Sequence, residues 1–322
     1  MTRGLKAASA PSSVSLITDR GRRTRQEAWQ RAVLLTDDGV PIEAAYEPFG
    51  PLAAPPAEPP AEPPAGPSPS APAVGVSGPA IVVAHGFTGA LERPALRRAA
   101  AALGGHAAVV TFSFRGHGRS GGRSTVGDRE VLDLAAAVRW ARRLGHRRVA
   151  TVGFSMGGSV VLRHAALYGA GTEAGAGAGA LEAKGGARER QGAHTDAAVA
   201  VSAPARWYYR GTAPMRRVHW AITRPAGRLV SRYGLRTRID ARGWDPEPLP
   251  PVAAAPLIAP TPLLIVHGDR DPYFPLDHPR SLAEAADPSS TELWIEPGFG
   301  HAENAADAEL LDRIAAWATS RV

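Results

Sequence analysis

One serine lies in a pattern that could make its hydroxyl a nucleophile. A short apolar strand at 149–152 leads directly into the motif Gly-Phe-Ser-Met-Gly at 153–157, which centres on Ser155. In such an elbow a sharp strand-to-helix turn lifts the serine toward a general base, and the flanking glycines, here Gly153 and Gly157, let strand and helix approach closely. A chain with 35 glycines can contain this pattern by chance. Its interpretation as a nucleophile motif therefore depends on finding an acid and a base elsewhere in the sequence.

Two later stretches supply the acid and the base that this serine would need. An apolar strand at 263–266 is followed by His-Gly-Asp-Arg-Asp at 267–271, so Asp269 and Asp271 are both candidate acids. A further strand at 293–295 is followed by a Gly-His turn that ends at His301. The order Ser, Asp, His along the chain is the order of the triad in hydrolases that carry this elbow.

The elements around these residues alternate between strands and helices. Strands are expected at 33–35, 42–46, 80–84, 108–112, 149–154, 197–201, 263–266 and 293–295, and helices at about 91–103 and 128–143, after Ser155, and at the C-terminus around Leu310 and Trp317. The first two strands flank a turn signal, Thr-Asp-Asp-Gly, and read as an edge hairpin. The others are continuously apolar, which suits a parallel sheet covered by helices on both faces, an α/β architecture.

Low-complexity segments and a cap segment interrupt the alternation of strands and helices. We expect a disordered basic N-terminus at 1–27 and one domain over 28–322, interrupted by a Pro-rich disordered insert at 51–78 and a Gly/Ala-rich loop at 169–196. Between 204 and 260 the strands give way to tryptophan, tyrosine and arginine, which indicates a helical cap.

Composition excludes several other classes of protein. With 322 residues and 44% hydrophobic content the chain can bury a full-sized core. Because it has no cysteine, disulfides, thiolate-held metals and a cysteine nucleophile are excluded. No apolar stretch near the N-terminus is long enough for a signal peptide or a membrane span, so a cytoplasmic location is expected.

The net charge of +7 is compatible with binding to nucleic acid, but the arginines are spread along the chain and no recognition motif accompanies them. We therefore expect no nucleic-acid partner. Contact of an amphipathic cap with a membrane surface is a lesser alternative. The histidines lack metal-ligand spacing, and no helix follows Gly121 in the Gly-x-Gly-x-x-Gly run at 116–121. Neither a metal nor an organic cofactor is expected.

Together these motifs resemble the α/β-hydrolase fold family, and within it the branch of bacterial carboxylesterases and serine-aminopeptidase-like hydrolases. In that family the acid is the aspartate four residues after the histidine of a His-Gly-x-x-Asp run, which corresponds to Asp271. The resemblance covers about 28–317. It implies a mostly parallel twisted sheet with a helical cap, and a triad of Ser155, Asp271 and His301.

The resemblance also extends to the loops beside the serine. The run His-Gly-Phe-Thr-Gly at 85–89 resembles the oxyanion loop of these carboxylesterases, and 114–120 resembles the Arg-Gly-His-Gly-x-Ser loop of many such hydrolases. It implies that the backbone N–H groups of Phe87 and Met156 form the oxyanion hole. His85 and Gly86 would be structural residues of the loop.

The chemistry expected from this resemblance is cleavage of a small-molecule carboxylic ester or acyl substrate through an acyl-serine. The same triad would serve a serine aminopeptidase-like peptidase, a thioesterase or an acyltransferase, and a catalytically silent binding protein could keep the fold. Substrate choice must lie in the cap, where ten arginines between Arg206 and Arg242 face the single acid Asp240. These arginines would either favour anionic substrates or solvate the outer face of the cap.

Overall fold

The computed structural model of the protein describes residues 30–49, 78–169 and 192–322. The predicted N-terminal segment 1–27 and most of the inserts 51–78 and 169–196 lie outside these residues. The last residues of the second insert are packed: Thr195 is buried, and its hydroxyl donates to the carbonyl of Ala197 at 2.8 Å.

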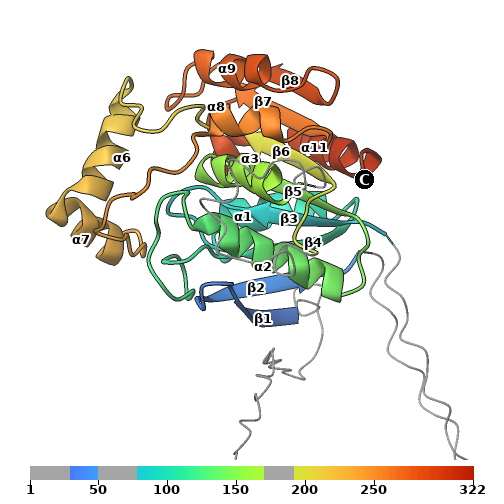
Figure 1. Ribbon diagram of the computed structural model, residues 1–322, viewed down its shortest axis with the longest axis horizontal. Helices are drawn as coiled ribbons and strands as arrows, with labels where there is room; N and C mark the ends of the chain where they lie inside the picture. The colour runs from blue at the N-terminus through green and yellow to red at the C-terminus, as the bar shows by residue number, and fades with distance from the viewer. Residues whose placement is uncertain (1–29, 50–77, 170–191) are drawn as a thin grey trace, which may run out of the picture.

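An eight-stranded sheet forms the centre of the molecule (Figure 1). Its strands are β1 (Gln30–Leu35), β2 (Pro41–Glu47), β3 (Ala80–Ala84), β4 (Ala108–Phe112), β5 (Val149–Phe154), β6 (Ala197–Val201), β7 (Leu263–Gly268) and β8 (Thr291–Glu296). Their order across the sheet is β1-β2-β4-β3-β5-β6-β7-β8. β1 pairs antiparallel with β2, and β2 with β4, whereas the pairs from β4 to β8 are parallel. The predicted fold class, a mostly parallel sheet with an edge hairpin, is confirmed.

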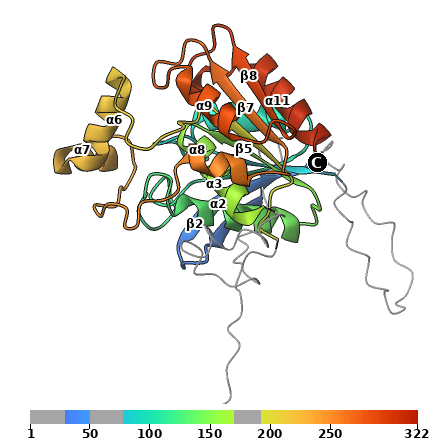
Figure 2. The same cartoon turned by 45° about the horizontal axis from the view of Figure 1, so that its top comes forward.

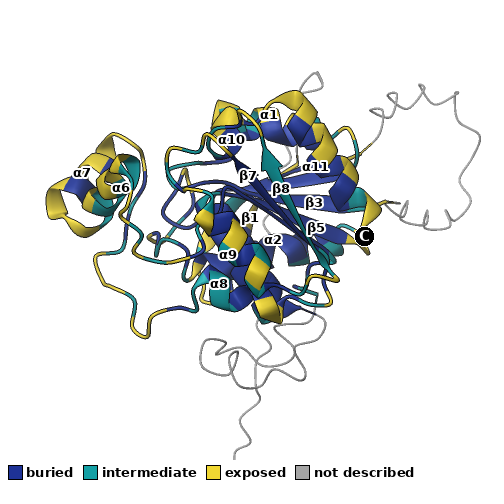
Figure 3. Cartoon of the chain, turned by 90° about the horizontal axis from the view of Figure 1, so that it is seen from above, coloured by how far each residue is buried: buried dark blue, intermediate teal, exposed yellow. Residues whose placement is uncertain are grey.

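Helices cover both faces of this sheet (Figures 2 and 3). On one face α1 (Pro94–Leu103) packs against α11 (Ala308–Ser320), and the short α10 (Ala302–Ala305) lies beside α1. The other face carries α2 (Glu130–Arg143), α3 (Met156–Tyr168), α8 (Pro251–Ala254), the 3-10 turn η1 (Ala255–Leu257) and α9 (Asp277–Ala285).

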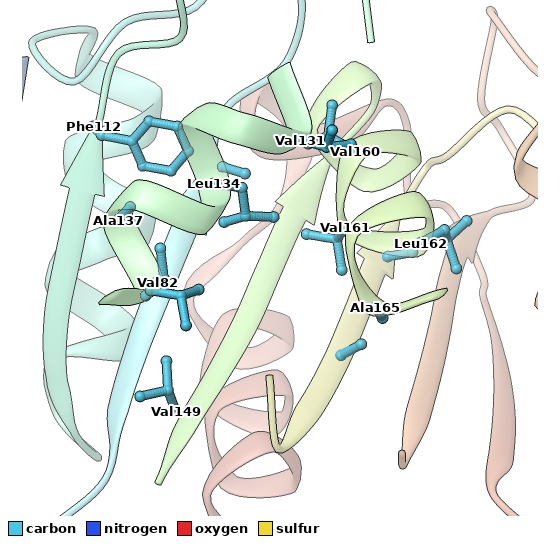
Figure 4. Close-up of a cluster of buried hydrophobic side chains, with 14 of the residues drawn as sticks. Val82, Phe112, Val131, Leu134, Ala137, Val149, Val160, Val161, Leu162 and Ala165 are labelled. Carbon is cyan, nitrogen blue, oxygen red and sulfur yellow. The ribbon is translucent and has the colours of Figure 1, made fainter. Parts of the chain in front are cut away.

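Strand β3 explains why the central strands are continuously apolar. Ile81 and Val83 join the core beneath α1 and α11, whereas Val82 joins the core beneath α2 and α3. Because successive side chains of a strand point to opposite faces, a strand covered on both sides must be apolar throughout. Figure 4 shows Val82 beside Leu134 and Ala137 of α2. Each such buried aliphatic side chain contributes about 1.5–3 kcal/mol.

Several element boundaries differ from the sequence-based expectation. The first helix begins at Pro94 rather than near residue 91, because proline is well suited to the first helical position. The second begins at Glu130 rather than 128, and the Glu130 carboxylate accepts hydrogen bonds from the backbone of Thr125 and Gly127. Helix α9 was not expected at all.

The segment between β6 and β7 contains two helices that stand away from the sheet, α6 (Ala213–Thr223) and α7 (Pro225–Tyr233), called the cap helices below (Figure 1). The Thr212 hydroxyl caps α6 by accepting from the Met215 N–H. Residues before proline avoid the helical region, so Arg224, extended before Pro225, ends α6. No residue of α6 is fully buried, which leaves its apolar side chains free to line a cavity.

The predicted site residues follow the carboxyl ends of the parallel strands. β5 ends immediately before Ser155, β7 ends shortly before Asp271, and β8 ends shortly before His301. The three side chains therefore emerge at one edge of the sheet, where open α/β sheets bind their ligands.

Candidate active site

Ser155 forms the turn between β5 and α3. Its φ of 52° and ψ of −113° are a backbone conformation that residues with a side chain rarely adopt. The turn brings the two backbones so close that a Cβ on Gly153 would meet the carbonyl of Gly157, and a Cβ on Gly157 would meet the carbonyl of Ala84. Both glycines thus have a steric reason to be glycine, and Ser155 is held where it lines a cavity.

His301 connects this serine to an acid. Its Nε2 lies 2.9 Å from Oγ of Ser155, and its Nδ1 lies 2.7 Å from Oδ2 of Asp271. An ionised carboxylate only accepts hydrogen bonds, so the ring proton belongs on Nδ1 and the Nε2 lone pair faces the serine hydroxyl. In this tautomer an imidazole can take a proton from serine. The structure brings all three predicted residues into one hydrogen-bonded line.

The two candidate acids have different partners. The Asp271 side chain is fully buried, and its Oδ1 accepts from the backbone N–H groups of Tyr273 at 2.7 Å and Phe274 at 3.1 Å. Asp269 instead accepts from the Gly298 N–H at 2.6 Å, which fastens the turn after β8. The geometry therefore favours Asp271 over Asp269 as the partner of the histidine.

The His301 ring is held from two further directions. The Tyr273 ring stacks on it with 4.2 Å between ring centroids and 29° between planes. The N–H of the next residue, Ala302, donates to Oγ of Ser202 at 3.1 Å. Ser202 and Ala302 both have positive φ, 52° and 54°, which is a cost of order 1–3 kcal/mol each that the surrounding packing must offset. These contacts fix the imidazole between serine and aspartate.

Two backbone N–H groups beside Ser155 are available to a ligand. Phe87 and Met156 both line the cavity, and among the described residues neither N–H donates a hydrogen bond. Met156 is the first residue of α3, where backbone N–H groups have no intrahelical acceptor and the helix dipole is positive. Both groups can therefore stabilise a developing negative charge.

The direction of the Phe87 N–H follows from its neighbours in the loop. The carbonyl of Gly86 accepts from Nδ1 of His85 at 2.7 Å and from the Gly89 N–H at 2.9 Å. The N–H and C=O of a trans peptide point in opposite directions, so fixing this carbonyl turns the Phe87 N–H away from it. Nε2 of His85 accepts from the Phe114 N–H at 3.0 Å, and burial lowers the pKa of His85 to about 3, so the ring is neutral at pH 7.

Sequence reasoning missed Glu303. Its carboxylate is buried, lines the same cavity, and accepts from the Gly86 N–H at 3.0 Å. Burial raises the pKa of Glu303 above its usual range. Glu303 thus ties the loop of 85–89 to the turn that carries His301. Its only sequence signal is its position two residues after that histidine.

A cavity of about 640 Å³ contains Ser155 and His301 in its lining. Its walls are mostly apolar, and many of the lining residues come from α6 and from aromatic residues beside it, whereas α7 contributes none. The indole N–H of Trp207 donates to the Pro248 carbonyl at 2.8 Å, and that of Trp244 to the Thr125 carbonyl at 2.6 Å. With both polar tips satisfied, the two rings pack 5.1 Å apart and offer apolar surface to a ligand.

The second histidine near the triad has structural contacts. Nε2 of His267, at the end of β7, donates to the Phe274 carbonyl at 2.9 Å and lies 3.5 Å from Oδ2 of Asp271. A carbonyl only accepts, so Nε2 carries the proton. Burial lowers the pKa of His267, and a neutral ring beside Asp271 leaves that carboxylate to His301.

Within 30–49, 78–169 and 192–322, no group of three His, Cys, Asp or Glu side chains is arranged to hold a metal ion. Over the same ranges no helix is both long enough and apolar enough to cross a bilayer. The loop at 116–121 does not run into a helix, since α2 begins only at Glu130. A pyrophosphate site at a helix N-terminus is therefore not formed there.

Comparison with known proteins gives a consistent result. The family described as "Alpha/beta hydrolase family" matches residues 81–313. A monoacylglycerol lipase of Mycolicibacterium smegmatis is 26% identical over 282 residues, which cover 75% of this chain and 88% of that protein.

Solved structures share the fold. The esterase Pf2001 of Pyrococcus furiosus matches with a TM-score of 0.60 at 19% identity, covering 94% of this chain and 98% of that one. The α/β hydrolase GrgF from Penicillium sp. sh18 matches with a TM-score of 0.58 at 17% identity, covering 91% of this chain and 99% of that one.

Proposed function

This chain belongs to the alpha/beta hydrolase family, and on that premise we propose that it is a serine hydrolase that cleaves carboxylic esters through an acyl-serine intermediate. The observation that carries this proposal is the His301 ring, hydrogen-bonded to Ser155 at 2.9 Å and to Asp271 at 2.7 Å at the wall of an apolar cavity. A serine hydroxyl so placed has a base to take its proton and room for an acyl group.

In the acylation step Oγ of Ser155 attacks the ester carbonyl carbon while its proton moves to Nε2 of His301. The buried Asp271 carboxylate stabilises the imidazolium that forms. The carbonyl oxygen becomes an oxyanion, which accepts hydrogen bonds from the N–H groups of Phe87 and Met156. The C–O bond to the alcohol then breaks, and His301 returns the proton to the departing alcohol oxygen.

In the deacylation step a water molecule attacks the acyl carbon and gives a proton to Nε2 of His301. The second tetrahedral intermediate uses the same two backbone donors. Its collapse releases the carboxylic acid and restores the proton on Ser155. Atoms and charges balance over the two steps without any further reactant.

Esters are favoured as the substrate class by the character of the cavity. Its walls are mostly apolar, and carboxylic esters with an acyl chain bury apolar surface there while only the scissile carbonyl needs polar contacts. The named activities of the relatives, monoacylglycerol lipase and esterase, are activities on ester bonds.

A panel of p-nitrophenyl esters of graded acyl chain length, assayed beside aminoacyl anilides and acyl thioesters, tests this function. We expect the esters to give the highest kcat/KM. Faster turnover of the anilides or thioesters would instead support a peptidase or a thioesterase on the same triad, and transfer to an added alcohol in preference to water would support an acyltransferase.

A fluorophosphonate probe tests whether the site is active at all. We expect covalent labelling of Ser155 in the folded protein and none in the Ser155→Ala variant. Folded wild-type protein that binds apolar ligands but takes up no probe would support a silent binding protein.

A further inference from the structure

Four arginines line the same cavity as Ser155: Arg206, Arg210, Arg217 and Arg242. Two of them form ion pairs with acidic side chains. Arg206 forms an ion pair with Asp277, and Arg242 pairs with Asp240 at 2.9 Å. The hydrogen bonds from Arg242 lower the pKa of Asp240 to about 2, so this carboxylate is ionised and already satisfied.

The other two arginines have no such partner. Among the described residues neither Arg210 nor Arg217 forms an ion pair, and both side chains are exposed at the cavity. The remaining acid of the cavity lining, Glu303, is buried against the Gly86 N–H. A nearby acid outside the lining, Glu247, faces Tyr208.

The charge of Arg210 acts on a neighbouring residue of the cavity lining. His219 of α6 also lines the cavity, and its pKa is lowered by burial and then by the charge of Arg210. The charges of Arg210 and Arg217, for which the described residues show no ion pair, thus lie beside walls that are otherwise apolar. Near a low-dielectric surface such a charge is less screened than in open water.

A guanidinium is charged at every physiological pH, and its planar set of donors matches carboxylate and phosphate oxygens. We propose that Arg210 and Arg217 form an anion subsite, so that the enzyme prefers esters bearing a carboxylate or phosphate group away from the scissile bond. The inference rests on the proposed ester hydrolysis and names its substrate class. Arg216 and Arg228 of the cap helices instead donate to backbone carbonyls of the cap segment.

Two matched substrate pairs test this subsite in the full chain. The first pair, p-nitrophenyl hexanoate and the mono-p-nitrophenyl ester of hexanedioic acid, places the anion on the acyl side. The second, monobutyrylglycerol and its phosphate, places it on the alcohol side. For at least one pair we expect a higher kcat/KM for the anionic member, and an advantage that shrinks as salt is raised.

The double variant Arg210→Ala/Arg217→Ala should reduce that anionic-to-neutral ratio about ten-fold or more, mainly through KM, because a charge-assisted hydrogen bond contributes about this factor. Arg232 on α7 is exposed and outside the cavity lining, so Arg232→Ala removes a cap charge without touching the subsite and should keep the ratio. Fluorophosphonate labelling gives the fraction of active sites in each preparation.

A ratio unchanged in the double variant for both pairs would overturn the subsite. An equal fall in Arg232→Ala would overturn it as well, because it would assign the preference to the overall charge of the cap. If the wild-type protein hydrolysed neutral esters as well as anionic ones, the anion subsite would be contradicted but the proposed ester hydrolysis would not. If it hydrolysed no ester at all, both proposals would be contradicted.

Discussion

The hydroxyl oxygen of Ser155 and Nε2 of His301 lie 2.9 Å apart although 146 positions separate them in the chain. The contact depends on β5 and β8 ending at the same edge of the sheet, and on the turns that follow them. The contact therefore depends on the sheet as a whole as well as on the local turn that carries each side chain.

Ser155→Ala and His301→Ala should each lower kcat for a p-nitrophenyl ester by a factor on the order of a million, as in serine proteases whose triad residues act as one unit. The double variant should lose no more than either single one. Steady-state kinetics, with circular dichroism to verify folding, measures this. Fully multiplicative losses would argue against a shared role.

Asp271→Asn should lower kcat about ten-thousand-fold, because an amide at this position no longer selects the tautomer with the proton on Nδ1. Asp269→Asn is the matched control, since Asp269 bonds to the Gly298 N–H, and it should retain activity within about ten-fold of wild type. If the two variants exchanged these results, the acid would be Asp269.

Glu303→Ala should lower kcat about 10- to 100-fold with little change in KM, because it frees the Gly86 N–H and loosens a loop that aims one oxyanion donor. Glu303→Gln keeps an oxygen that can accept from Gly86 and should recover most of the loss. Neutral and anionic esters should be affected alike. A change confined to KM would place Glu303 in substrate binding instead.

Burial lowers the pKa of His164 to about 3, against about 6.5 in an unfolded chain. The stability that its neutral form contributes is present above pH 6.5 and is lost as the pH falls from 6.5 toward 3. His164→Phe keeps the stacking on Tyr168 and should flatten the pH dependence of the unfolding free energy by up to roughly 1.4 kcal/mol per pH unit in this window.

Urea unfolding at constant ionic strength between pH 8 and pH 4 measures this slope. The difference between wild type and His164→Phe at pH 8, where the ring is neutral in both states, gives the packing contribution alone. Equal slopes for the two proteins would contradict the assignment to His164.

Gly157→Ala should destabilise the protein by roughly 3 kcal/mol or more, since its Cβ would meet backbone carbonyls of Ala84 and His85 that cannot move without shifting β3. Gly243→Ala is the control, because a Cβ there has open space and no positive φ. Thermal unfolding should show a lower Tm for the first variant only.

The strands and the triad region could be predicted because each is a local signal: an apolar run, a glycine pair, a turn after a strand. Glu303 could not, because its contact with Gly86 spans 217 positions and nothing in the sequence joins them. Helix α9 was missed for a different reason. Its buried residues are His278, Pro279 and Leu282, which do not make the repeated apolar face by which an amphipathic helix is recognised.

Segments 50–77 and 170–191 join the rest of the chain at the end of the sheet opposite Ser155. β2 ends, and β3 and β6 begin, at the amino ends of the parallel strands, and α3 runs back to that same end from Ser155. A fluorophore or tag attached at either of these points would therefore start at the end of the sheet opposite Ser155. The fold thereby keeps Ser155 and His301 at one end of the parallel strands and the attachment points of both segments at the other.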